Sequence, residues 1–320
     1  MLRRPPTEAP VTNKLEALRA RMTLPVIVAP MFLISGPDMV IAACRAGVIG
    51  CFPAPNAREL GTLDAWCARI SMETQEAAPW ALNLICHSSY ARFDAEIEIV
   101  KRHKPPLVIT ALGSPARVLD TVHGYGGLVF ADVSRPVHAR KAIEAGADGL
   151  VLVSAGAGGH TGSYSPFAFV AEVRRFWSGP IVLSGAISDA RSILAAQALG
   201  ADFAYMGTRF LAAQESLGEP DRKAMTIAVS MEDIVTSAAV TGVPANWMLP
   251  SLTAAGFTPE MLRAERKMDF TSADKAKPWK NIWGAGQAVG AVTASEPVTD
   301  IVARLRADYS ALRAAFCKAG

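Results

Sequence analysis

Short apolar runs alternate with helical segments along residues 25–210 of this chain. The runs are rich in Val, Ile, Leu and Ala, which is typical of strands that are buried on both faces. Successive runs start about 20 to 35 residues apart, which is the spacing of βαβ units. Between the second and third runs, Asn56 is expected to cap a helix over Ala57–Thr74. The expected strands are Pro25–Pro30, Val48–Phe52, Trp80–Cys86, Leu107–Ala111, Gly127–Val133, Gly149–Val153, Ile181–Ser184 and Phe203–Met206.

Eight strand–helix units predict a closed barrel, because open doubly wound sheets rarely contain eight of them. The expected fold class is therefore α/β, a (β/α)8 TIM barrel. The alternation stops after about Leu217, and residues 221–275 are expected to form a helical cap at the barrel mouth.

The two ends of the chain complete the expected organisation. An N-terminal leader, residues 1–24, contains a helix over Thr12–Met22, and the barrel is formed by 25–220 with 276–320 returning to it. This C-terminal extension ends in a helix over Val298–Lys318. Its apolar positions share one face at helical spacing: Ile301, Leu305, Tyr309 and Leu312.

Composition narrows the class of protein. With 320 residues, 51% of them hydrophobic, the chain can bury one large core. The net charge of +3 is small and no basic stripe with interleaved aromatic residues occurs, so nucleic acid is not an expected partner. No run of about 18 apolar residues occurs either, so no membrane span is expected.

The five cysteines are scattered and lack the spacing of a metal site, so no metal is expected. Their number is odd, and most lie in apolar segments, where a free thiol behaves as a small hydrophobic group. The N-terminal stretch has no apolar secretory segment. These features together predict a cytoplasmic location. The cysteines are Cys44, Cys51, Cys67, Cys86 and Cys317.

A glycine-dense loop with one histidine follows the sixth expected strand. Glycine lets the backbone approach a ligand closely, and a histidine at the end of a buried parallel strand is well placed for acid–base chemistry. His160 is therefore the catalytic candidate, and Gly158 and Gly159 are candidates for contact with a cofactor. The competing interpretation is a glycine-rich turn with a solvated histidine. The loop reads Ala157-Gly158-Gly159-His160-Thr161-Gly162.

The seventh and eighth expected strands each end in a glycine at the start of a helical segment. Loops at these positions commonly bind phosphate in (β/α)8 barrels, because free amides and the helix dipole favour an anion. Such a phosphate would belong either to the substrate or to a cofactor such as FMN. The competing interpretation is that the glycines only permit tight turns. The candidate residues are Ser184, Gly185, Ala186, Gly207 and Thr208.

Other strand ends supply candidates for contact with the ring and ribityl chain of FMN. Asn83 is an amide in an apolar run, and if it is buried it needs hydrogen-bond partners, which a ligand can supply. Met31, next to Ala29, either packs on a flavin face or belongs to the core. Asp132 either binds the cofactor or only caps the following helix. His87 faces the same mouth as His160 and is a substrate candidate.

Several of these segments occur in one characteristic order. They are Ala29-Pro30-Met31, Asn83, Ala157–Gly162, Leu183–Ile187 and Met206–Phe210. In this order they resemble the nitronate monooxygenase family, formerly called 2-nitropropane dioxygenases, and the related FMN-dependent enoyl-ACP reductases. The later segments Thr241–Pro244 and Trp283–Gln287 are also similar to that family. The resemblance covers about residues 25–292.

The resemblance implies non-covalent FMN, with its phosphate at the loops of Gly185 and Gly207 and with contacts from Met31 and Asn83. It implies that His160 deprotonates a nitroalkane or orients an anionic nitronate. Oxidation by O2 would then give a carbonyl compound and nitrite. The expected partners are a small-molecule substrate and O2, and a homodimer is compatible with this interpretation. The substrate candidates are His87, Trp283 and Gln287.

Some residues depart from the family pattern and keep other functions open. Many members carry Gln and Glu before the Gly-Gly-His, whereas this chain has Val153–Ala157 there. The first alternative is an FMN-dependent reductase of an enoyl thioester or other activated alkene that uses NAD(P)H. A second is a flavin-free lyase or isomerase with a phosphorylated substrate. A third is a protein that binds flavin without turnover.

Overall fold

The computed structural model describes residues 8–263 and 281–319. Within these ranges eight parallel strands close into a barrel, with β9 pairing back onto β1. All eight strands expected from the sequence are present, so the prediction of a (β/α)8 barrel is confirmed. The barrel strands, in order around it, are β1 (Val26–Val28), β2 (Ile49–Pro53), β3 (Trp80–Ile85), β4 (Leu107–Ala111), β5 (Leu128–Val133), β6 (Gly149–Val153), β8 (Ile181–Ser184) and β9 (Phe203–Met206).

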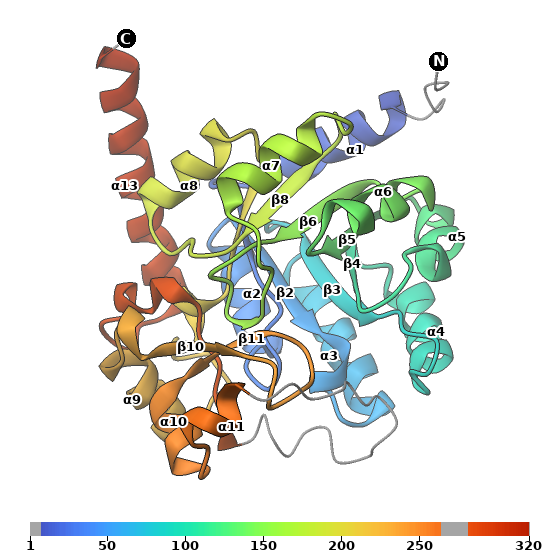
Figure 1. Cartoon of the computed structure of the whole chain (residues 1–320). Coiled ribbons are helices and arrows are strands. Elements are labelled where there is room, and N and C mark those ends of the chain that lie inside the picture. Colours follow the sequence, from blue (N-terminus) through green and yellow to red (C-terminus); the bar gives the residue numbers. More distant parts are fainter. Residues whose placement is uncertain (1–7, 264–280, 320) are drawn as a thin grey trace.

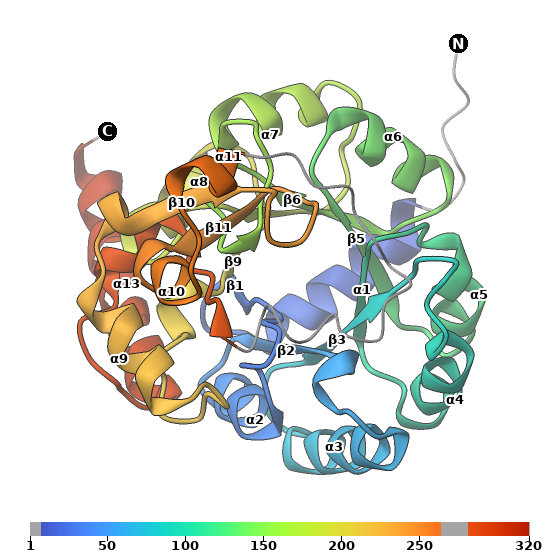
Figure 2. The same cartoon turned by 60° about the horizontal axis from the view of Figure 1, so that its bottom comes forward.

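Helices surround the strands on the outside, as the view toward the barrel mouth shows (Figure 2). The ring consists of α2 (Pro37–Arg45), α3 (Leu60–Glu73), α4 (Phe93–His103), α5 (Ala116–Gly124), α6 (Pro136–Glu144), α7 (Pro166–Arg174) and α8 (Ala190–Ala198). Directly after β9, where an eighth helix of the ring would begin, the chain forms the short 3₁₀ helix η2 (Thr208–Phe210).

The C-terminal helix α13 (Val298–Ala319) packs against α8 and α2 and completes the ring (Figure 1). Its predicted apolar face is confirmed, since Ile301, Leu305 and Tyr309 are buried in the core. The Tyr309 hydroxyl also donates a hydrogen bond to Gln197 of α8 at 2.6 Å.

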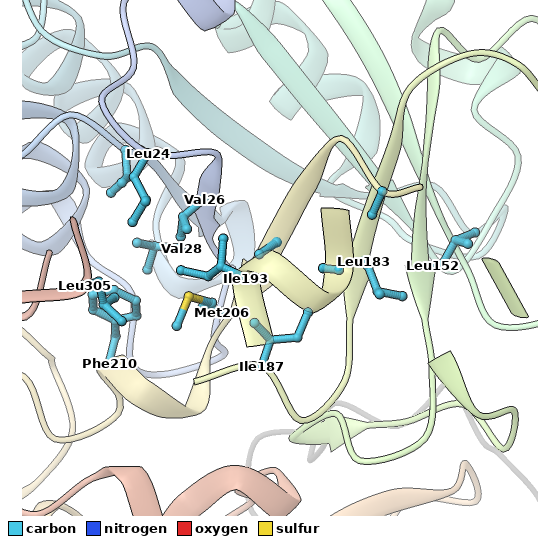
Figure 3. Close-up of a cluster of buried hydrophobic side chains, with 14 of the residues drawn as sticks. Leu24, Val26, Val28, Leu152, Leu183, Ile187, Ile193, Met206, Phe210 and Leu305 are labelled. Carbon is cyan, nitrogen blue, oxygen red and sulfur yellow. The ribbon is translucent and has the colours of Figure 1, made fainter. Parts of the chain in front are cut away.

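Side chains alternate along each strand between two cores. Val26 and Val28 point outward and pack with the surrounding helices (Figure 3), whereas Ile27 points into the barrel. Each fully buried side chain of this size contributes about 1.5–3 kcal/mol through burial. Both faces of every strand are therefore apolar, which is the origin of the continuous hydrophobic runs in the sequence.

Helix α1 (Glu8–Ala20) lies across the end of the barrel at which the strands begin. Leu15 and Leu18 pack onto the barrel-interior cluster that contains Ile27. The helix begins at Glu8 rather than at the expected Thr12. Residues 1–7 of the expected leader lie outside the described residues.

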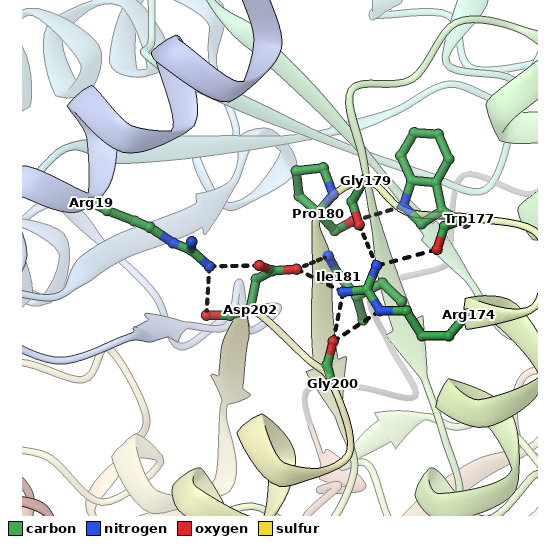
Figure 4. A network of polar contacts seen from close by, with 8 residues as sticks. All are labelled: Arg19, Arg174, Trp177, Gly179, Pro180, Ile181, Gly200 and Asp202. Carbon is green, nitrogen blue, oxygen red and sulfur yellow. Dashed lines mark hydrogen bonds and ion pairs between the residues drawn. The ribbon is translucent and has the colours of Figure 1, made fainter. Parts of the chain in front are cut away.

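A polar network around Asp202 fastens the same end of the barrel (Figure 4). Its carboxylate accepts from Arg19 of α1 at 2.7 Å, from Arg174 of α7 at 2.9 Å and from the Ile181 amide of β8 at 2.8 Å. Arg174 also donates to the carbonyl of Gly200. This network lies at the ends of the strands opposite the barrel mouth, so its role is structural.

Asn56 does not cap a helix, which corrects the expectation from the sequence. It ends the 3₁₀ helix η1 (Ala54–Asn56), and α3 begins only at Leu60. The buried Asn56 amide instead accepts from the Leu33 amide at 2.8 Å and donates to the carbonyls of Met31 at 3.0 Å and Ser35 at 2.7 Å. Asn56 therefore holds the β1–α2 loop, a contact distant in sequence that spacing alone does not reveal.

The expected helical cap contains helices, and two strands lie between them. The described part contains α9 (Pro220–Ala228), η3 (Met231–Asp233), β10 (Ile234–Ser237), β11 (Ala245–Met248), α10 (Leu249–Ala254) and α11 (Pro259–Arg263). Strands β10 and β11 form an antiparallel sheet with β7 (Gly159–His160), which comes from the barrel loop after β6. Residues 264–275 of the expected cap and 276–280 of the returning segment lie outside the described residues. We refer to 220–263 as the cap.

Candidate active site

A cavity of about 1040 Å³ opens at the C-terminal ends of the barrel strands. Cofactor and ligand sites typically occupy about 300–1,000 Å³, so this cavity is large enough for a cofactor together with a small substrate. Most of the candidates from the sequence line it. They are Ala29, Met31, Asn83, His87, Asp132, Gly158, Gly159, His160, Ser184, Gly185, Ala186, Gly207 and Thr208.

Two substrate candidates do not line the cavity. Gln287 is exposed at the start of η4 (Gln287–Ala291), and Trp283 packs against the core. The same segment does reach the cavity, but through Gly284, Ala285 and Gly286. This segment therefore contributes mainly backbone atoms to the cavity lining. A search of the sequence for reactive side chains does not find such a contribution.

Strand β7 holds His160 in the cap sheet rather than in a free loop. Gly159 is paired with Asn246 of β11 and His160 with Ala245. The buried Asn246 amide also donates to the carbonyl of Ala157 at 2.7 Å. The histidine is therefore positioned jointly by the barrel, through β6, and by the cap, through β11.

The glycines of this loop are required by backbone packing on its other side. A Cβ on Gly158 would lie 2.7 Å from the Gly286 nitrogen and 3.1 Å from the Thr208 hydroxyl. The Gly286 amide itself donates to that hydroxyl at 2.8 Å, and the Gln287 amide donates to the carbonyl of Gly156 at 3.0 Å. The loop is thus enclosed between β11 and residues 284–287.

The imidazole of His160 is open to the cavity, although protein atoms surround it. Desolvation by this surrounding protein lowers the pKa of His160 below its ordinary value of 6.5. Near neutral pH the ring is therefore uncharged and has the protonation state that a general base requires.

The two glycine loops lie where phosphate commonly binds in such barrels. Gly185 and Ala186 have consecutive positive φ values of 120° and 55°, so the backbone turns sharply there. The Ala186 amide makes only a long contact of 3.4 Å with the carbonyl of Gly156. After the neighbouring strand β9, Thr208 accepts a hydrogen bond from the Gly286 amide through its oxygen and keeps its hydroxyl proton available for an acceptor.

The barrel interior meets the cavity at Asp132 and Tyr205. Within the described residues, Oδ1 of Asp132 and the hydroxyl of Tyr205 are buried and have no hydrogen-bond partner. Burial raises the pKa of Asp132 to about 7, and burial followed by the charge of Asp132 raises the pKa of Tyr205. Buried polar atoms without partners are rare, so this pair fits the polar edge of a ligand.

Three further candidates are held by local contacts. Nδ2 of Asn83 donates to the carbonyl of Ile109 at 3.1 Å, which satisfies part of the amide before any ligand binds. The Met31 sulfur would lie 3.5 Å from a Cβ at Gly207, so it sits directly against the second glycine loop. Nδ1 of His87 lies 2.7 Å from the Ser89 hydroxyl.

Among the residues that line the cavity without having been expected from the sequence are Arg58, Tyr205 and Arg222. Tyr205 could have been noticed, because it is a polar position inside an apolar strand, as Asn83 is. Arg58 and Arg222 lie in ordinary polar segments and carry no such signal. Among the described residues no group of His, Cys, Asp and Glu could hold a metal ion. No described helix has the length and apolar character needed to cross a membrane.

A closed parallel barrel whose mouth brings together two glycine loops, buried polar atoms without a described partner and a histidine has the site of a barrel enzyme. The comparison with known families agrees with this class. The family model for nitronate monooxygenase matches residues 64–308. The chain belongs to the nitronate monooxygenase family, and it is a flavin-dependent oxidoreductase of the kind that oxidises nitronates.

Individual relatives cover most of the chain. A nitronate monooxygenase from Paraburkholderia phytofirmans is 28% identical over 88% of this chain and 91% of its own. An octahydroindene-carboxyl-CoA dehydrogenase from Rhodococcus jostii is 25% identical over 83% of this chain and 75% of its own. The structure of a nitroalkane oxidase from Streptomyces ansochromogenes has the same fold, with a TM-score of 0.80 and 23% identity over 94% of this chain and 99% of its own.

Replacing Gly158 by alanine is expected to lower the free energy of unfolding by about 1–3 kcal/mol, because the new methyl group meets backbone that cannot move aside. Gly207→Ala is the matched control. There the nearest atoms to a Cβ are at 3.5 Å, an ordinary contact, and the stability should change by less than about 0.5 kcal/mol. Urea denaturation of both variants measures the difference. Equal losses would show that the loop is not enclosed as described.

Asp132→Asn is expected to stabilise the flavin-free protein more at pH 8 than at pH 5. Because the pKa of Asp132 is raised, folding opposes its ionisation. The resulting loss of folding stability is absent below pH 3.8, grows as the pH rises toward about 7 and is constant above about 7. At about 1.4 kcal/mol per pKa unit, the gain at pH 8 should exceed that at pH 5 by on the order of 2 kcal/mol. A gain independent of pH, in urea denaturation at both values, would refute a raised pKa.

Proposed function

We propose that this enzyme uses FMN to oxidise alkyl nitronates, and nitroalkanes that it deprotonates itself, with O2 to a carbonyl compound and nitrite. The observation that carries the proposal is the uncharged His160 in the same cavity as the two glycine loops. A carbon acid needs a base that is unprotonated at the working pH. The glycine loops and the orphaned polar atoms supply a place for the redox cofactor.

FMN fits the residues that are present. The loops of Gly185, Ala186, Gly207 and Thr208 would hold its phosphate, since they offer amides and a hydroxyl without a carboxylate among them. When bound, FMN supplies the electron acceptor for the nitronate and the site of reaction with O2.

The ring of FMN would lie against Met31 and Ala29, which close the β1 side of the cavity. Asn83, Asp132 and Tyr205 would hydrogen-bond its polar atoms. The oxygens of Asp132 and Tyr205, which have no described partner, would then gain one, which removes the cost of burying them alone.

His160 would take the proton from the carbon next to the nitro group. The C–H bond breaks, its electron pair remains on the substrate as the nitronate, and the imidazole becomes a cation. This imidazolium then stabilises the anion it has produced. A substrate added as the nitronate needs no deprotonation, so His160 would act on it only by orienting the negative charge.

Reduction of an enoyl thioester or related alkene by NAD(P)H remains the second candidate. It is favoured by the similarity to the Rhodococcus jostii dehydrogenase, whose name describes a carboxyl-CoA substrate. That function uses the same flavin site with a different electron donor. A flavin-free phosphate site in the two glycine loops is the third candidate.

An anaerobic absorbance experiment separates these functions. Purified protein loaded with FMN is mixed with ethyl nitronate in one sample and with NADH or NADPH in another. Loss of the flavin absorbance with nitronate alone supports the proposal, whereas rapid loss with a nicotinamide alone favours the reductase. A protein that binds no FMN after the cofactor is added back would contradict both.

His160→Asn is expected to slow kcat/KM for neutral nitroethane by about 10²–10⁴-fold, the usual contribution of a general base. Turnover of ethyl nitronate should fall much less, because that substrate is already deprotonated. In the wild type, kcat/KM for nitroethane should decline only below pH 6.5, since the pKa of His160 is lowered. FMN content, measured by absorbance, is the control. Equal losses on both substrates would remove His160 from proton transfer.

Gly207→Asp is expected to weaken FMN binding at least tenfold, because it directs a carboxylate toward the proposed phosphate position. Gly207→Ala adds bulk without charge and should bind FMN as the wild type does, since its Cβ makes only ordinary contacts. Fluorescence titration of FMN into the flavin-free proteins measures both affinities. Wild-type affinity in the aspartate variant would refute this placement of the phosphate.

A further inference from the structure

A buried arginine from the cap lines the cavity. Arg222 lies on α9 and the residue is only 7% exposed. Within the described residues its Nε has no hydrogen-bond partner. Burial lowers the pKa of Arg222 to about 10, and no carboxylate among the described residues offsets this effect.

An uncompensated buried cation is costly, because desolvation of a charge is repaid only by a partner of opposite sign. The described lining of the cavity contains one carboxyl group, that of Asp132, whose raised pKa keeps it largely protonated below neutral pH. Arg58 and Arg92 line the same cavity. Arg92 already donates to the carbonyls of Ala57 and Arg58 at 2.9 Å each. The cavity is therefore electropositive, and Arg222 is its buried cation without a described partner.

Arg222 enters the cavity on the β1 side, next to the loop of Gly207 after β9 and one strand further from the loop of Gly185 after β8. The segment before α9 packs on the β1–α2 loop, where the Leu217 amide donates to the carbonyl of Ile34 at 2.9 Å. Cδ of Arg222 would lie 3.8 Å from a Cβ at Gly218 in that segment. In the barrel, β9 separates β1 from β8, whose loop holds Gly185 and Ala186. Arg222 therefore stands on the β1 side, apart from the loop that follows β8.

The cap also links Arg222 to the catalytic candidate. The Thr226 hydroxyl, one turn after Arg222, lies 3.9 Å from the sulfur of Met248 at the end of β11. Strand β11 pairs with the strand that holds His160. The cap therefore presents both a buried cation and a neutral base to the same cavity. A site that binds one end of a substrate and reacts with its other end requires such an arrangement.

We propose that Arg222 is an anion-binding site that receives an oxyanion of the substrate, a carboxylate or phosphate, separate from the cofactor's phosphate. The inference rests on the proposed function for the reaction that follows, but the binding itself does not depend on it. Guanidinium forms two parallel hydrogen bonds to such groups. Substrates that carry an anionic group should therefore be preferred over uncharged ones of similar size.

Arg222→Met tests the site, because it keeps the apolar stem and removes the charge. Sodium propionate and inorganic phosphate are titrated into the FMN-loaded protein and followed by the difference spectrum of the flavin. We expect at least a tenfold loss of affinity for these anions in Arg222→Met and a smaller loss in Arg222→Lys. The variant should fold, since an uncompensated buried charge is removed. Wild-type affinity for both anions in Arg222→Met would overturn the proposal.

Arg58→Met is the matched control, because it removes the same charge from an exposed position of the same cavity. Solvent screens that charge, so anion affinity should change less than twofold. Losses as large as those in Arg222→Met would show a general field effect rather than a site, and would refute the assignment.

Two further measurements identify the source of the anion and separate this inference from the flavin chemistry. Affinities of Arg222→Met for FMN and riboflavin should both equal those of the wild type. A loss for FMN alone would assign Arg222 to the cofactor's phosphate and overturn the substrate site. In flavin-free protein, propionate should raise the melting temperature of the wild type but not of Arg222→Met. This result would support the anion site at Arg222 even if the enzyme fails to oxidise nitronates. An equal rise of the melting temperature in both proteins would refute the site.

Discussion

The enclosure of the glycine loop between two other stretches of backbone is the constraint on which the rest of the site depends. Gly159 and His160 pair with β11 on one side, and the Gly156 carbonyl accepts a hydrogen bond from the Gln287 amide on the other. Neither contact leaves room for side chains at the crossing with Gly286. Because three segments far apart in sequence meet here, largely through their main chains, they hold His160 in place relative to the barrel. Glycine is the residue that permits this approach.

Desolvation sets the protonation states of the cavity. It lowers the pKa of His160, raises that of Asp132 to about 7 and lowers that of Arg222 to about 10. The first two shifts favour uncharged groups near neutral pH, whereas Arg222 remains charged. A cavity with a neutral base and a buried cation attracts anions without protonating the base, which suits chemistry on carbon acids and their anions.

The barrel and the cap contribute different residues to the site. The barrel provides the glycine loops and the orphaned polar groups, whereas the cap supplies β11 and Arg222. Relatives of this chain include both nitronate monooxygenases and an octahydroindene-carboxyl-CoA dehydrogenase. With the cofactor bound at the barrel loops as proposed, the cap would contact the remaining parts of the substrate, and one fold could serve different substrates.

The sequence by itself determined the barrel, because strands buried on both faces leave uninterrupted apolar runs that no packing detail is needed to recognise. It also indicated the glycine loops and His160, since unusual residue types at strand ends stand out locally. Only the tertiary structure decided that Asn56 holds a loop, that the cap contains strands, that Trp283 and Gln287 lie outside the cavity lining, and that Arg222 enters it. Each of these depends on contacts between segments distant in sequence. Which side chains are buried, and which residues they contact, depends on the folded chain, so the local spacing of residues does not reveal it.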